Sequence, residues 1–401
     1  MGERSPHTRE VAGSNPAAPI QSEAAIDTVS ASSSIDILDS MSISDLVESA
    51  AEGECRSELS AQPLPPCGWS REVALDPRHR PQTLDRPAST VRRDWWRGPQ
   101  EAHLLEESRG RYRQLTWQEI ALLQGFQPSW FDIEGLSKTD RIRAIGDAVP
   151  PPLARALFDS IAQGRNWSNR TAIELCAGAG GLASGVRNRL EHVAIVDHWQ
   201  VSCEILRHEK PWSSDVVHEA GATDMDWGEY ADQVGLLSGG PPCQPWSQAG
   251  KRQGFRDPRD LLGGIHKIVA TIKPEAFLFE NVPGLASESN RDYFDAILDN
   301  LRRPGDGLRY GVMAAIFNAA DYGVPQVRRR LFFVGFRDEP TAAAWRTLDA
   351  MASLRSHRAP TVADPRRRPW RTVGDTIGSR EDPGGWRGWV ENQPTPAPIA
   401  V

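Results

Sequence analysis

The sequence has few cysteines and no long hydrophobic run. Five cysteines are spread over 401 residues without close pairing, which argues against a disulfide framework and against a zinc site built from cysteine pairs. Free thiols in turn indicate a reducing compartment. No apolar stretch reaches transmembrane length, and the N-terminus "MGERSPHTREVAG" lacks the hydrophobic segment of a secretory signal. These absences predict a cytoplasmic protein with no membrane partner and no metal site.

An overall excess of basic side chains is also missing, since the formal net charge is −7. Residues 1–60 carry eleven acidic and three basic side chains, so the rest of the chain is close to neutral. Within that rest, arginine-rich runs provide the local charge that phosphate contacts need. Taken alone, such runs are usually solvated surface. They are "TVRRDWWR" (90–97), "GKRQGFRDPR" (250–259), "QVRRR" (326–330) and "DPRRRPWR" (364–371).

Short apolar runs alternate with helical periodicity between residues 171 and 337, for example in "HVAIVDHW" (192–199) and "AFLFENV" (276–282). This alternation predicts an α/β fold, a Rossmann-like sheet with helices on both faces. Ligands of such folds bind at the carboxyl ends of the strands. Polar residues at strand boundaries are therefore the candidates for a functional site.

A glycine-rich turn, "ELCAGAGGLASGV" (174–186), stands between a predicted strand and a predicted helix. Gly178, Gly180 and Gly181 would let the backbone approach a ligand at the helix N-terminus, and Asp197 ends the next strand, where it could bond ribose hydroxyls. The turn thus predicts a nucleoside cofactor. Its spacing is G-x-G-G, so it could equally serve a dinucleotide or only packing, and no Walker A lysine is present.

A cysteine lies between prolines in "SGGPPCQPWSQAG" (238–250), directly after an apolar run. A lone cysteine is most often a small buried hydrophobe, but Cys243 is on a stiff turn, and a following helix would lower its pKa. Glu280 and Arg328 also lie at predicted strand boundaries. A thiol, a carboxyl and a guanidinium brought together there suit attack on an electron-poor heteroaromatic ring.

Four segments together resemble the cytosine-C5 DNA methyltransferase family, which uses S-adenosylmethionine. They are the glycine turn, "SGGPPCQPWSQAGKRQGFRDPR" (238–259), "FENVPGL" (279–285) and "GVPQVRRRLFFVG" (323–335). The resemblance implies a methyl transfer to C5 of a flipped-out cytosine through a covalent Cys243–C6 adduct. It also implies that Glu280 engages N3 and that Arg328, with Arg330 beside it, holds O2. A base inside the stack must be rotated out, so phosphate contacts are expected.

The same resemblance implies the remaining site residues. For the cofactor they are Leu175, Cys176, Ala177, Gly178, Ala179, Gly180, Gly181, Leu182, Asp197, His198, Trp199, Asp224, Pro241, Asp147, Ala148 and Val149. For DNA they are Gln244, Ser247, Lys251, Arg252, Arg256 and Gln326. Asp224 is included as a substitute, because Gly221 stands where the family commonly has an aspartate.

The order of the motifs is rotated. "DRPASTVRRDWW" (85–96), "RYRQLTWQEIALLQGFQPSWF" (111–131) and "RIRAIGDAVPPPLARALFDSIA" (141–162) resemble the motifs that usually close these enzymes, yet they precede the glycine turn. We therefore predict a disordered acidic leader over 1–65, permuted parts of the catalytic fold over 66–165, the catalytic core over 166–337, and a small recognition region with a frayed tail over 338–401.

The short recognition region leaves several questions open. Double-stranded DNA is the expected partner, and the expected location is the nucleoid. A second polypeptide that supplies target recognition, or a cognate restriction endonuclease, could be a further partner. Two other functions are compatible with the motifs. One is a tRNA cytosine-5 methyltransferase, and the other is a non-catalytic DNA-binding relative that needs a partner subunit.

Overall fold

The computed structural model describes residues 81–93, 103–108, 111–163, 165–186, 189–208, 211–243, 260–305 and 307–378. The expected acidic leader, the end of the recognition region and five of the proposed DNA contacts lie outside the described residues. Those five are Gln244, Ser247, Lys251, Arg252 and Arg256.

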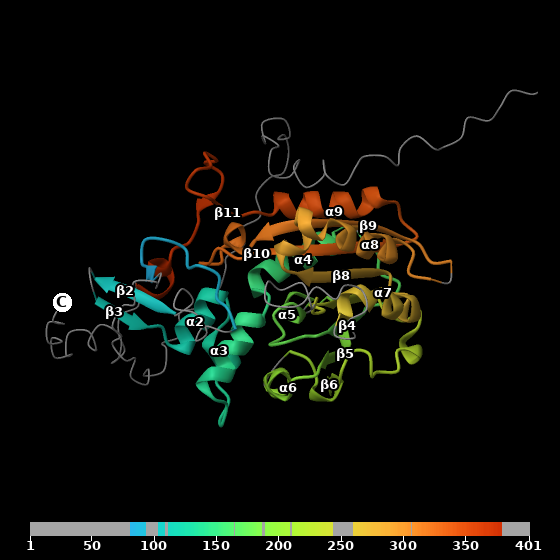
Figure 1. The fold of residues 1–401 in the computed structure, drawn as a ribbon, viewed down its shortest axis with the longest axis horizontal. Helices are drawn as coiled ribbons and strands as arrows, with labels where there is room; N and C mark the ends of the chain where they lie inside the picture. Colours follow the sequence, from blue (N-terminus) through green and yellow to red (C-terminus); the bar gives the residue numbers. More distant parts are fainter. Residues whose placement is uncertain are drawn as a thin grey trace, which may run out of the picture. The chain divides into compact units, whose positions relative to one another are not determined.

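The centre of the fold is a seven-stranded sheet with the order β6-β5-β4-β7-β8-β10-β9 (Figure 1). The first five strands in this order pair in parallel, and β10 runs antiparallel to both of its neighbours. This mixed sheet confirms the predicted α/β Rossmann-like fold. The strands are β4 (Thr171–Leu175), β5 (Glu191–Asp197), β6 (Val217–Glu219), β7 (Leu236–Gly239), β8 (Ala276–Asn281), β9 (Tyr310–Asn318) and β10 (Arg329–Arg337).

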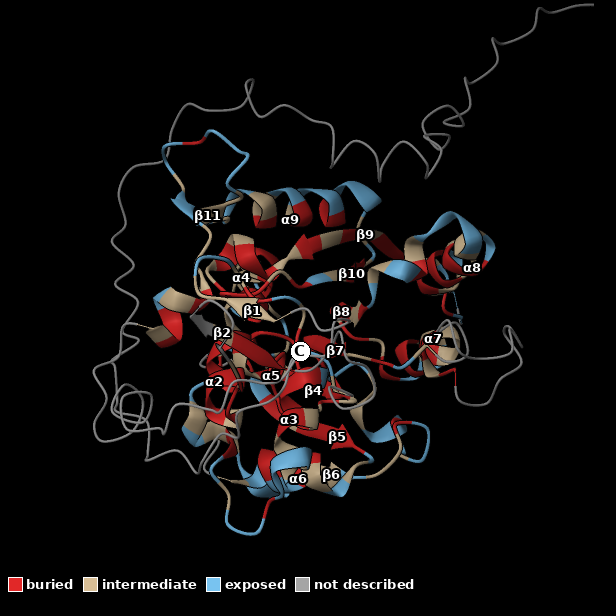
Figure 2. Cartoon of the chain, turned by 60° about the vertical axis from the view of Figure 1, so that its left-hand side comes forward, coloured by how far each residue is buried: buried red, intermediate tan, exposed pale blue. Residues whose placement is uncertain are grey.

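Helices cover both faces of the sheet because its strands are apolar on both sides. Along β10, Phe332 and Val334 share a core with α4 and α9, whereas Phe333 packs against Phe294 of α8, with ring centroids 5.7 Å apart. Figure 2 shows the strands buried and the outer side of α9 exposed. The helices around the sheet are α4 (Pro151–Ala162), α5 (Ala183–Val186), α6 (Gln200–Arg207), α7 (Leu261–Ile272), α8 (Arg291–Arg302) and α9 (Thr341–Ser353).

A smaller lobe precedes the sheet in the chain. It contains β1 (Gln82–Thr83), β2 (Leu104–Ser108), β3 (Arg111–Gln114), α2 (Trp117–Gln124), η3 (Pro128–Phe131) and α3 (Lys138–Asp147). Its helix α2 starts with a capping box in which Thr116 and Glu119 bond each other's backbone amides. Its end continues into α4, which packs on α5 and α9, and residues 163–170 then lead into β4. This path allows the rotated motif order.

The last described elements are β11 (His357–Arg358), β12 (Arg368–Pro369) and η10 (Gly374–Gly378). Strand β9 ends at Asn318 opposite Arg329, the first residue of β10, and η9 (Ala319–Tyr322) follows it. Since Leu331 of β10 pairs with Asn281, the last residue of β8, this end of β9 lies at the edge where the parallel strands end. Ser356, just before β11, donates its backbone N–H to Asp321 of η9 at 3.0 Å.

No helix among the described residues is long and apolar enough to cross a membrane.

Candidate active site

A cavity of about 1570 Å³ opens at the carboxyl edge of the sheet. Its walls come from the ends of β4, β5, β7 and β8, the start of β10 and the end of α3, which is where the strand pattern predicted a ligand site. The residues discussed below that line it are Arg92, Arg93, Arg143, Asp147, Glu174, Cys176, Gly178, Asp197, Trp199, Cys243, Glu280, Asn281, Arg328 and Arg330.

Cys243 lies in this cavity and is held by Asn281. The Cys243 Sγ–H donates to Asn281 Oδ1 at 3.0 Å, and Asn281 Nδ2 donates to the carbonyl of Pro241 at 3.0 Å. The same Oδ1 accepts the N–H of Val282 at 2.9 Å. One amide side chain therefore joins the end of β8 to the turn that carries the thiol. No role was assigned to Asn281 from the sequence.

Burial raises the pKa of Cys243 to about 11, and the charges of Asp260 and Glu280 add to this effect. The expected lowering by the following helix is wrong for this structure. Helix α7 does follow, but Asp260 caps its N-terminus by accepting the N–H of Gly263 at 3.1 Å, so a carboxylate occupies the position whose positive potential would have favoured a thiolate.

Glu280 pairs with Arg330 at the end of β8. Arg330 Nε lies 2.7 Å from Glu280 Oε1, and the two side chains are only 14% and 15% exposed. A Cβ placed on Gly240 would come within 3.4 Å of Glu280 Oε2, so the carboxylate lies close to the Gly-Gly-Pro-Pro turn before Cys243. The thiol, the acid and a guanidinium thus line one cavity, as the sequence predicted, but the guanidinium that contacts the acid belongs to Arg330.

Arg328 has a different position from the one expected. Its side chain is 1% exposed and donates to three backbone carbonyls, those of Val91 at 2.8 Å, Gly146 at 2.8 Å and Ala148 at 3.1 Å. All three belong to the smaller lobe or to its end. We therefore correct the expectation that Arg328 holds the base, because its guanidinium is engaged in attaching this lobe to the sheet.

Gln326 is also buried, which argues against the expected contact with DNA. Its Oε1 accepts the N–H of Val91 at 2.9 Å, and its Nε2 donates to Gln124 Oε1 at 2.6 Å and to the carbonyl of Leu123 at 3.2 Å. With no exposed surface, Gln326 joins the same two parts of the fold as Arg328. We correct its assignment accordingly.

The glycine turn after β4 follows the predicted geometry. Gly178 and Gly180 have φ angles of 54° and 76°, which favour glycine. Asp197 accepts the N–H of Gly178 through Oδ2 and the N–H of Trp199 through Oδ1, both at 2.8 Å. This carboxylate therefore fixes the two loops that form one end of the cavity. A Cβ on Gly178 would meet no atom within 4 Å, so there is open space directly over the turn.

The smaller lobe closes this end of the cavity. A Cβ on Gly181 would lie 2.0 Å from the carbonyl oxygen of Val149, so the turn and the junction of α3 with α4 are in close contact. Trp130 donates its indole N–H to the carbonyl of Ala179 at 2.7 Å. The guanidinium of Arg143 lies over the ring of Trp199, 4.5 Å from its centroid. No signal near Arg143 in the sequence could have predicted this contact.

Most of the expected cofactor residues reach the cavity wall, and some do not. Those on the wall are Cys176, Ala177, Gly178, Leu182, Asp197, His198, Trp199, Pro241, Asp147, Ala148 and Val149. Leu175, Ala179, Gly180 and Gly181 lie in or beside the turn but not on the wall. Asp224 is not on the wall either, because its carboxylate lies over Gly221, where a Cβ would be 2.5 Å from Oδ2.

Two ionisable residues of the wall, Glu174 and Arg93, were not assigned from the sequence. Glu174 is fully buried beside Ser238, which donates to it at 3.3 Å, and burial raises the pKa of Glu174 to about 8. Arg93 and Asp147 form an ion pair at 3.4 Å. Glu174 lies within the apolar strand β4, and the sequence pattern of this strand gave no reason to expect a carboxyl group in the cavity. Among the described residues, no cluster of His, Cys, Asp or Glu could hold a metal ion.

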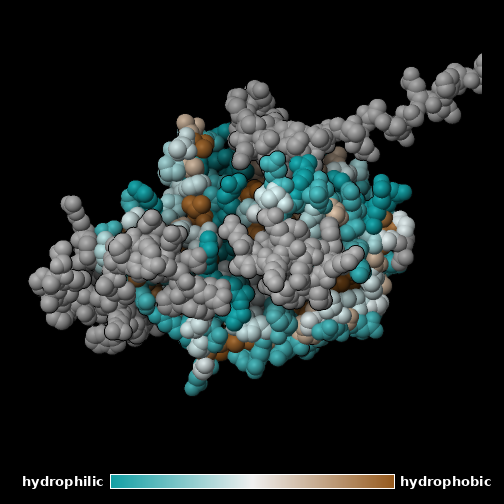
Figure 3. Space-filling model, viewed as in Figure 1, coloured by the Kyte–Doolittle hydropathy of each residue, from teal (hydrophilic) through white to brown (hydrophobic). Residues whose placement is uncertain are grey.

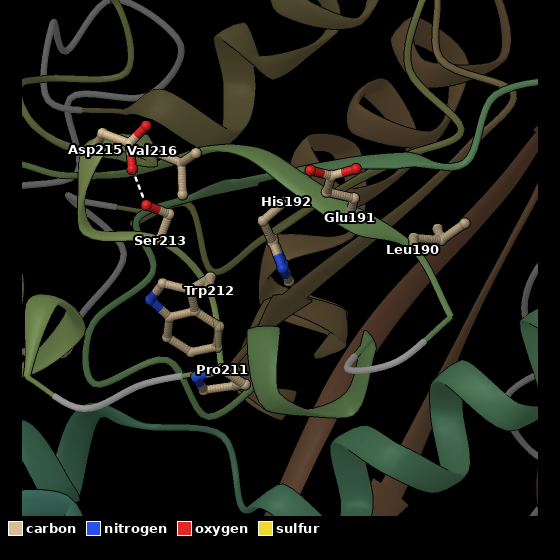
Figure 4. A pocket seen from close by; sticks show the side chains of 8 residues that line it. All are labelled: Leu190, Glu191, His192, Pro211, Trp212, Ser213, Asp215 and Val216. Atoms are coloured by element: carbon tan, nitrogen blue, oxygen red, sulfur yellow. Dashed lines mark hydrogen bonds between the residues drawn. The ribbon is translucent and has the colours of Figure 1, made fainter.

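A second, smaller cavity of about 270 Å³ lies at the start of β5 (Figure 4). It is lined by Leu190, Glu191, His192, Pro211, Trp212, Ser213, Asp215 and Val216, and Ser213 bonds Asp215 within it. Burial lowers the pKa of His192 to about 4, so this imidazole is neutral near pH 7. The cavity lies at the amino end of its strand and shares no lining residue with the cavity that holds Cys243, Glu280 and Arg330, so it is not the candidate active site.

Comparisons with known proteins agree with this geometry. The family model for C-5 cytosine-specific DNA methylase matches residues 71–163 and 170–377. The type II methyltransferase M.NgoMIV of Neisseria gonorrhoeae is 37% identical over 43% of this chain and 53% of its own length. M.NaeI of Lentzea aerocolonigenes is 32% identical over 57% of this chain and 51% of its own.

A solved structure of a putative DNA modification methyltransferase from an E. coli prophage is 25% identical over 51% of this chain and 53% of that chain, with a TM-score of 0.36. The matched region spans about half the length of these relatives. The family model covers most of the sequence in two consecutive blocks. The chain belongs to the C-5 cytosine-specific DNA methylase family.

Proposed function

We propose that the protein is a DNA (cytosine-5-)-methyltransferase that uses S-adenosylmethionine. The observation that carries this proposal is that Cys243, the Glu280–Arg330 pair and the open space over Gly178 belong to one cavity. The relatives named above are type II methyltransferases, so we further propose a role in restriction and modification.

The residues present fit the proposed cofactor. The glycine turn leaves open space above Gly178 that a nucleoside can occupy. Trp199 provides an aromatic ring, which the guanidinium of Arg143 contacts. Asp197 and the ends of α3 and α4 fix the surrounding loops. When bound there, S-adenosylmethionine supplies an electrophilic methyl group.

The other end of the cavity would activate the base. The Cys243 thiol loses its proton, and its sulfur forms a bond to C6 of a cytosine that has been rotated out of the duplex. Glu280 holds a proton at N3, so negative charge does not accumulate on the ring, and Arg330 binds O2. The electron pair displaced from the 5,6 double bond makes C5 nucleophilic. C5 would take up the methyl group as the methyl–sulfur bond of the donor breaks. Loss of the C5 proton to solvent and cleavage of the S–C6 bond then re-form the 5,6 double bond and release Cys243 as a thiolate, which takes a proton back from solvent.

Asn281 acts on the nucleophile in this scheme. In the structure it accepts the hydrogen bond of a protonated thiol whose pKa is about 11. Deprotonation must therefore accompany base binding, when Glu280 and Arg330 exchange their mutual contact for contacts to the ring. Asn281 keeps the sulfur atom in place while this happens, since its amide also bonds Pro241.

Trapping on duplex DNA that contains 5-fluorocytosine tests the proposal, because fluorine at C5 prevents release of the adduct. We expect the full chain with S-adenosylmethionine to form a covalent complex that is absent in Cys243→Ser. Bisulfite sequencing of DNA from cells that express the protein would show the methylated context. An adduct with tRNA and none with DNA would point to the tRNA enzyme. No adduct with either, with or without a partner polypeptide, would support the non-catalytic relative.

A further inference from the structure

A strongly basic segment lies outside the cavity and has no role in the proposed chemistry. Residues 355–371, here called the arginine loop, contain six arginines and a single acidic residue, Asp364. The loop includes β11 and β12, which pair in parallel. Six positive charges within so short a stretch repel each other in water, so this composition needs an explanation.

The arginine loop is fixed at the carboxyl edge of the sheet, on the same edge as the active-site cavity. Trp370 donates its indole N–H to Asp321 Oδ1 at 2.8 Å, and Asp321 belongs to η9, which follows the end of β9. Figure 1 shows β11 beyond the end of β10 that faces the smaller lobe. In Figure 3, hydrophilic side chains, drawn in teal, lie beside paler and brown ones in the region where Figure 1 places β11 and the start of β10.

A continuous run of backbone connects the loop to the cavity. Val373 donates its N–H to the carbonyl of Arg86 at 2.8 Å, which places the end of the loop beside the segment 82–93. That segment then runs along residues 325–328, where Ala88 bonds Pro325 and Val327 at 2.8 Å each. It ends at Arg92 and Arg93 on the cavity wall. An extended chain from Arg86 to Arg92 covers about 20 Å.

Some arginines of the loop serve its internal structure. Asp364 lies 3.2 Å from Arg366 and 3.4 Å from Arg367, so the one acid of the loop is already paired. Arg355 lies 3.7 Å from Asp321. Arg358 donates to the carbonyls of Val362 and Arg367.

Arg368 and Arg371 remain. Arg368 is exposed and forms no ion pair in the described part of the chain, and Arg371 is half-buried near Asp375. Together they lower the pKa of His357, an effect that adds to burial and shows a positive potential at this place. Arg86, Arg92 and Arg329 are exposed along the same run of backbone.

We propose that Arg368 and Arg371 bind the phosphate backbone of duplex DNA on one side of the flipped cytosine. A fully extended chain from Arg86 to Arg92 would span at most about six base-pair steps of 3.4 Å. A row of separated guanidinium groups fits regularly spaced phosphates, and each neutralised phosphate releases counterions. The identity of the ligand rests on the proposed function. The segment 82–93 leads from the arginine loop to the cavity, and this cavity accepts a DNA base only if the proposed function is right.

The test measures the dissociation constant of the full chain for a duplex of about 20 base pairs at salt concentrations from about 0.05 to 0.3 M. We compare wild type, Arg368→Ala, the double variant Arg368→Ala/Arg371→Ala, and Arg346→Ala. Arg346 is an exposed arginine on α9 and serves as the matched control. If loss of the half-buried Arg371 disturbs folding, the single variant Arg368→Ala still tests the proposal, because Arg368 is exposed.

The slope of log Kd against log salt should fall by about 0.9 for each lost phosphate contact, and Kd at low salt should rise about tenfold in the double variant. The slope and the Kd of Arg346→Ala should stay at the wild-type values, and so should its kcat. Equal slopes for all proteins, in a chain that methylates DNA, would overturn the inference and leave the proposed function standing. If the wild type binds no duplex and forms no adduct with DNA, both fail. A lowered slope without methylation would refute the proposed function alone.

Discussion

Two arginines separated by one residue have different surroundings, which leads to a first prediction. Arg330 contacts Glu280 in the cavity, whereas Arg328 satisfies three buried carbonyls. We expect Arg330→Ala to reduce kcat by about 10²- to 10³-fold with an unchanged Tm. Arg328→Ala should instead destabilise the fold by about 3 kcal/mol, because it leaves buried acceptors without donors. Steady-state kinetics and thermal unfolding of both variants check this, and the reverse assignment of effects would contradict it.

Asn281 supports a second prediction at this scale. Replacing it with alanine removes the acceptor of the thiol and the bond to Pro241. We expect kcat to fall about 10²-fold while Kd for DNA stays constant, since the residue positions the nucleophile and is not assigned to the duplex. Single-turnover kinetics and DNA binding separate the two quantities. A loss confined to DNA affinity would argue against this positioning role.

The reactivity of Cys243 gives a third prediction. Its pKa of about 11 is raised by burial and then by Asp260. An acid with a raised pKa stays protonated over a wider range, so alkylation of the free protein by iodoacetamide should increase with pH up to about 11. Asp260→Asn keeps a good helix cap but removes the charge, so its alkylation curve should shift to lower pH. Mass spectrometry of Cys243 at a series of pH values measures the shift, and coincident curves would show that Asp260 does not contribute to the raised pKa.

At the scale of elements, the contact between the glycine turn and the α3–α4 junction is the most constrained. A methyl group at Gly181 has no room, because the carbonyl of Val149 lies 2.0 Å from the Cβ position. We expect Gly181→Ala to weaken S-adenosylmethionine binding by at least about tenfold and to lower Tm. Gly264→Ala in α7 is the control, since its Cβ meets nothing within 4 Å and alanine favours helix by about 0.5–1 kcal/mol. Calorimetric titration with S-adenosylmethionine and thermal unfolding compare the two variants. Equal affinities would show that the contact between Gly181 and Val149 does not contribute to cofactor binding.

Strands, glycine turn and thiol could be predicted from the sequence because each has a local signal. The apolar runs and the positive φ of Gly178 are such signals. The roles of Arg328 and Arg330 could not be separated, because Arg328 precedes β10 and its partners are Val91 and Gly146, far away in the chain. The raised pKa of Cys243 was missed for a similar reason, since the sequence did not show that Asp260 would cap α7.

At the scale of the whole molecule, the smaller lobe and the sheet should unfold together. Residues of the lobe share one apolar cluster with Ala179 and Ile205, which follow β4 and β5. Arg328 and Gln326 add buried hydrogen bonds across the same contact. We expect hydrogen exchange in α2 to report the same opening free energy as in β4 and β10. Faster exchange confined to α2 and α3 would show that the lobe opens independently.

A second polypeptide that completes target recognition stays a prediction.

The packing of α4 has a consequence for synthesis on the ribosome. Leu157 and Phe158 of α4 bury their side chains against strands that include Phe332 and Val334 of β10. About 175 residues separate these partners, so translation at about 5–20 residues per second leaves the helix without β10 for roughly 9 to 35 seconds. During that time the nascent chain presents an uncovered apolar stripe, which makes it a client for chaperones that bind emerging hydrophobic segments.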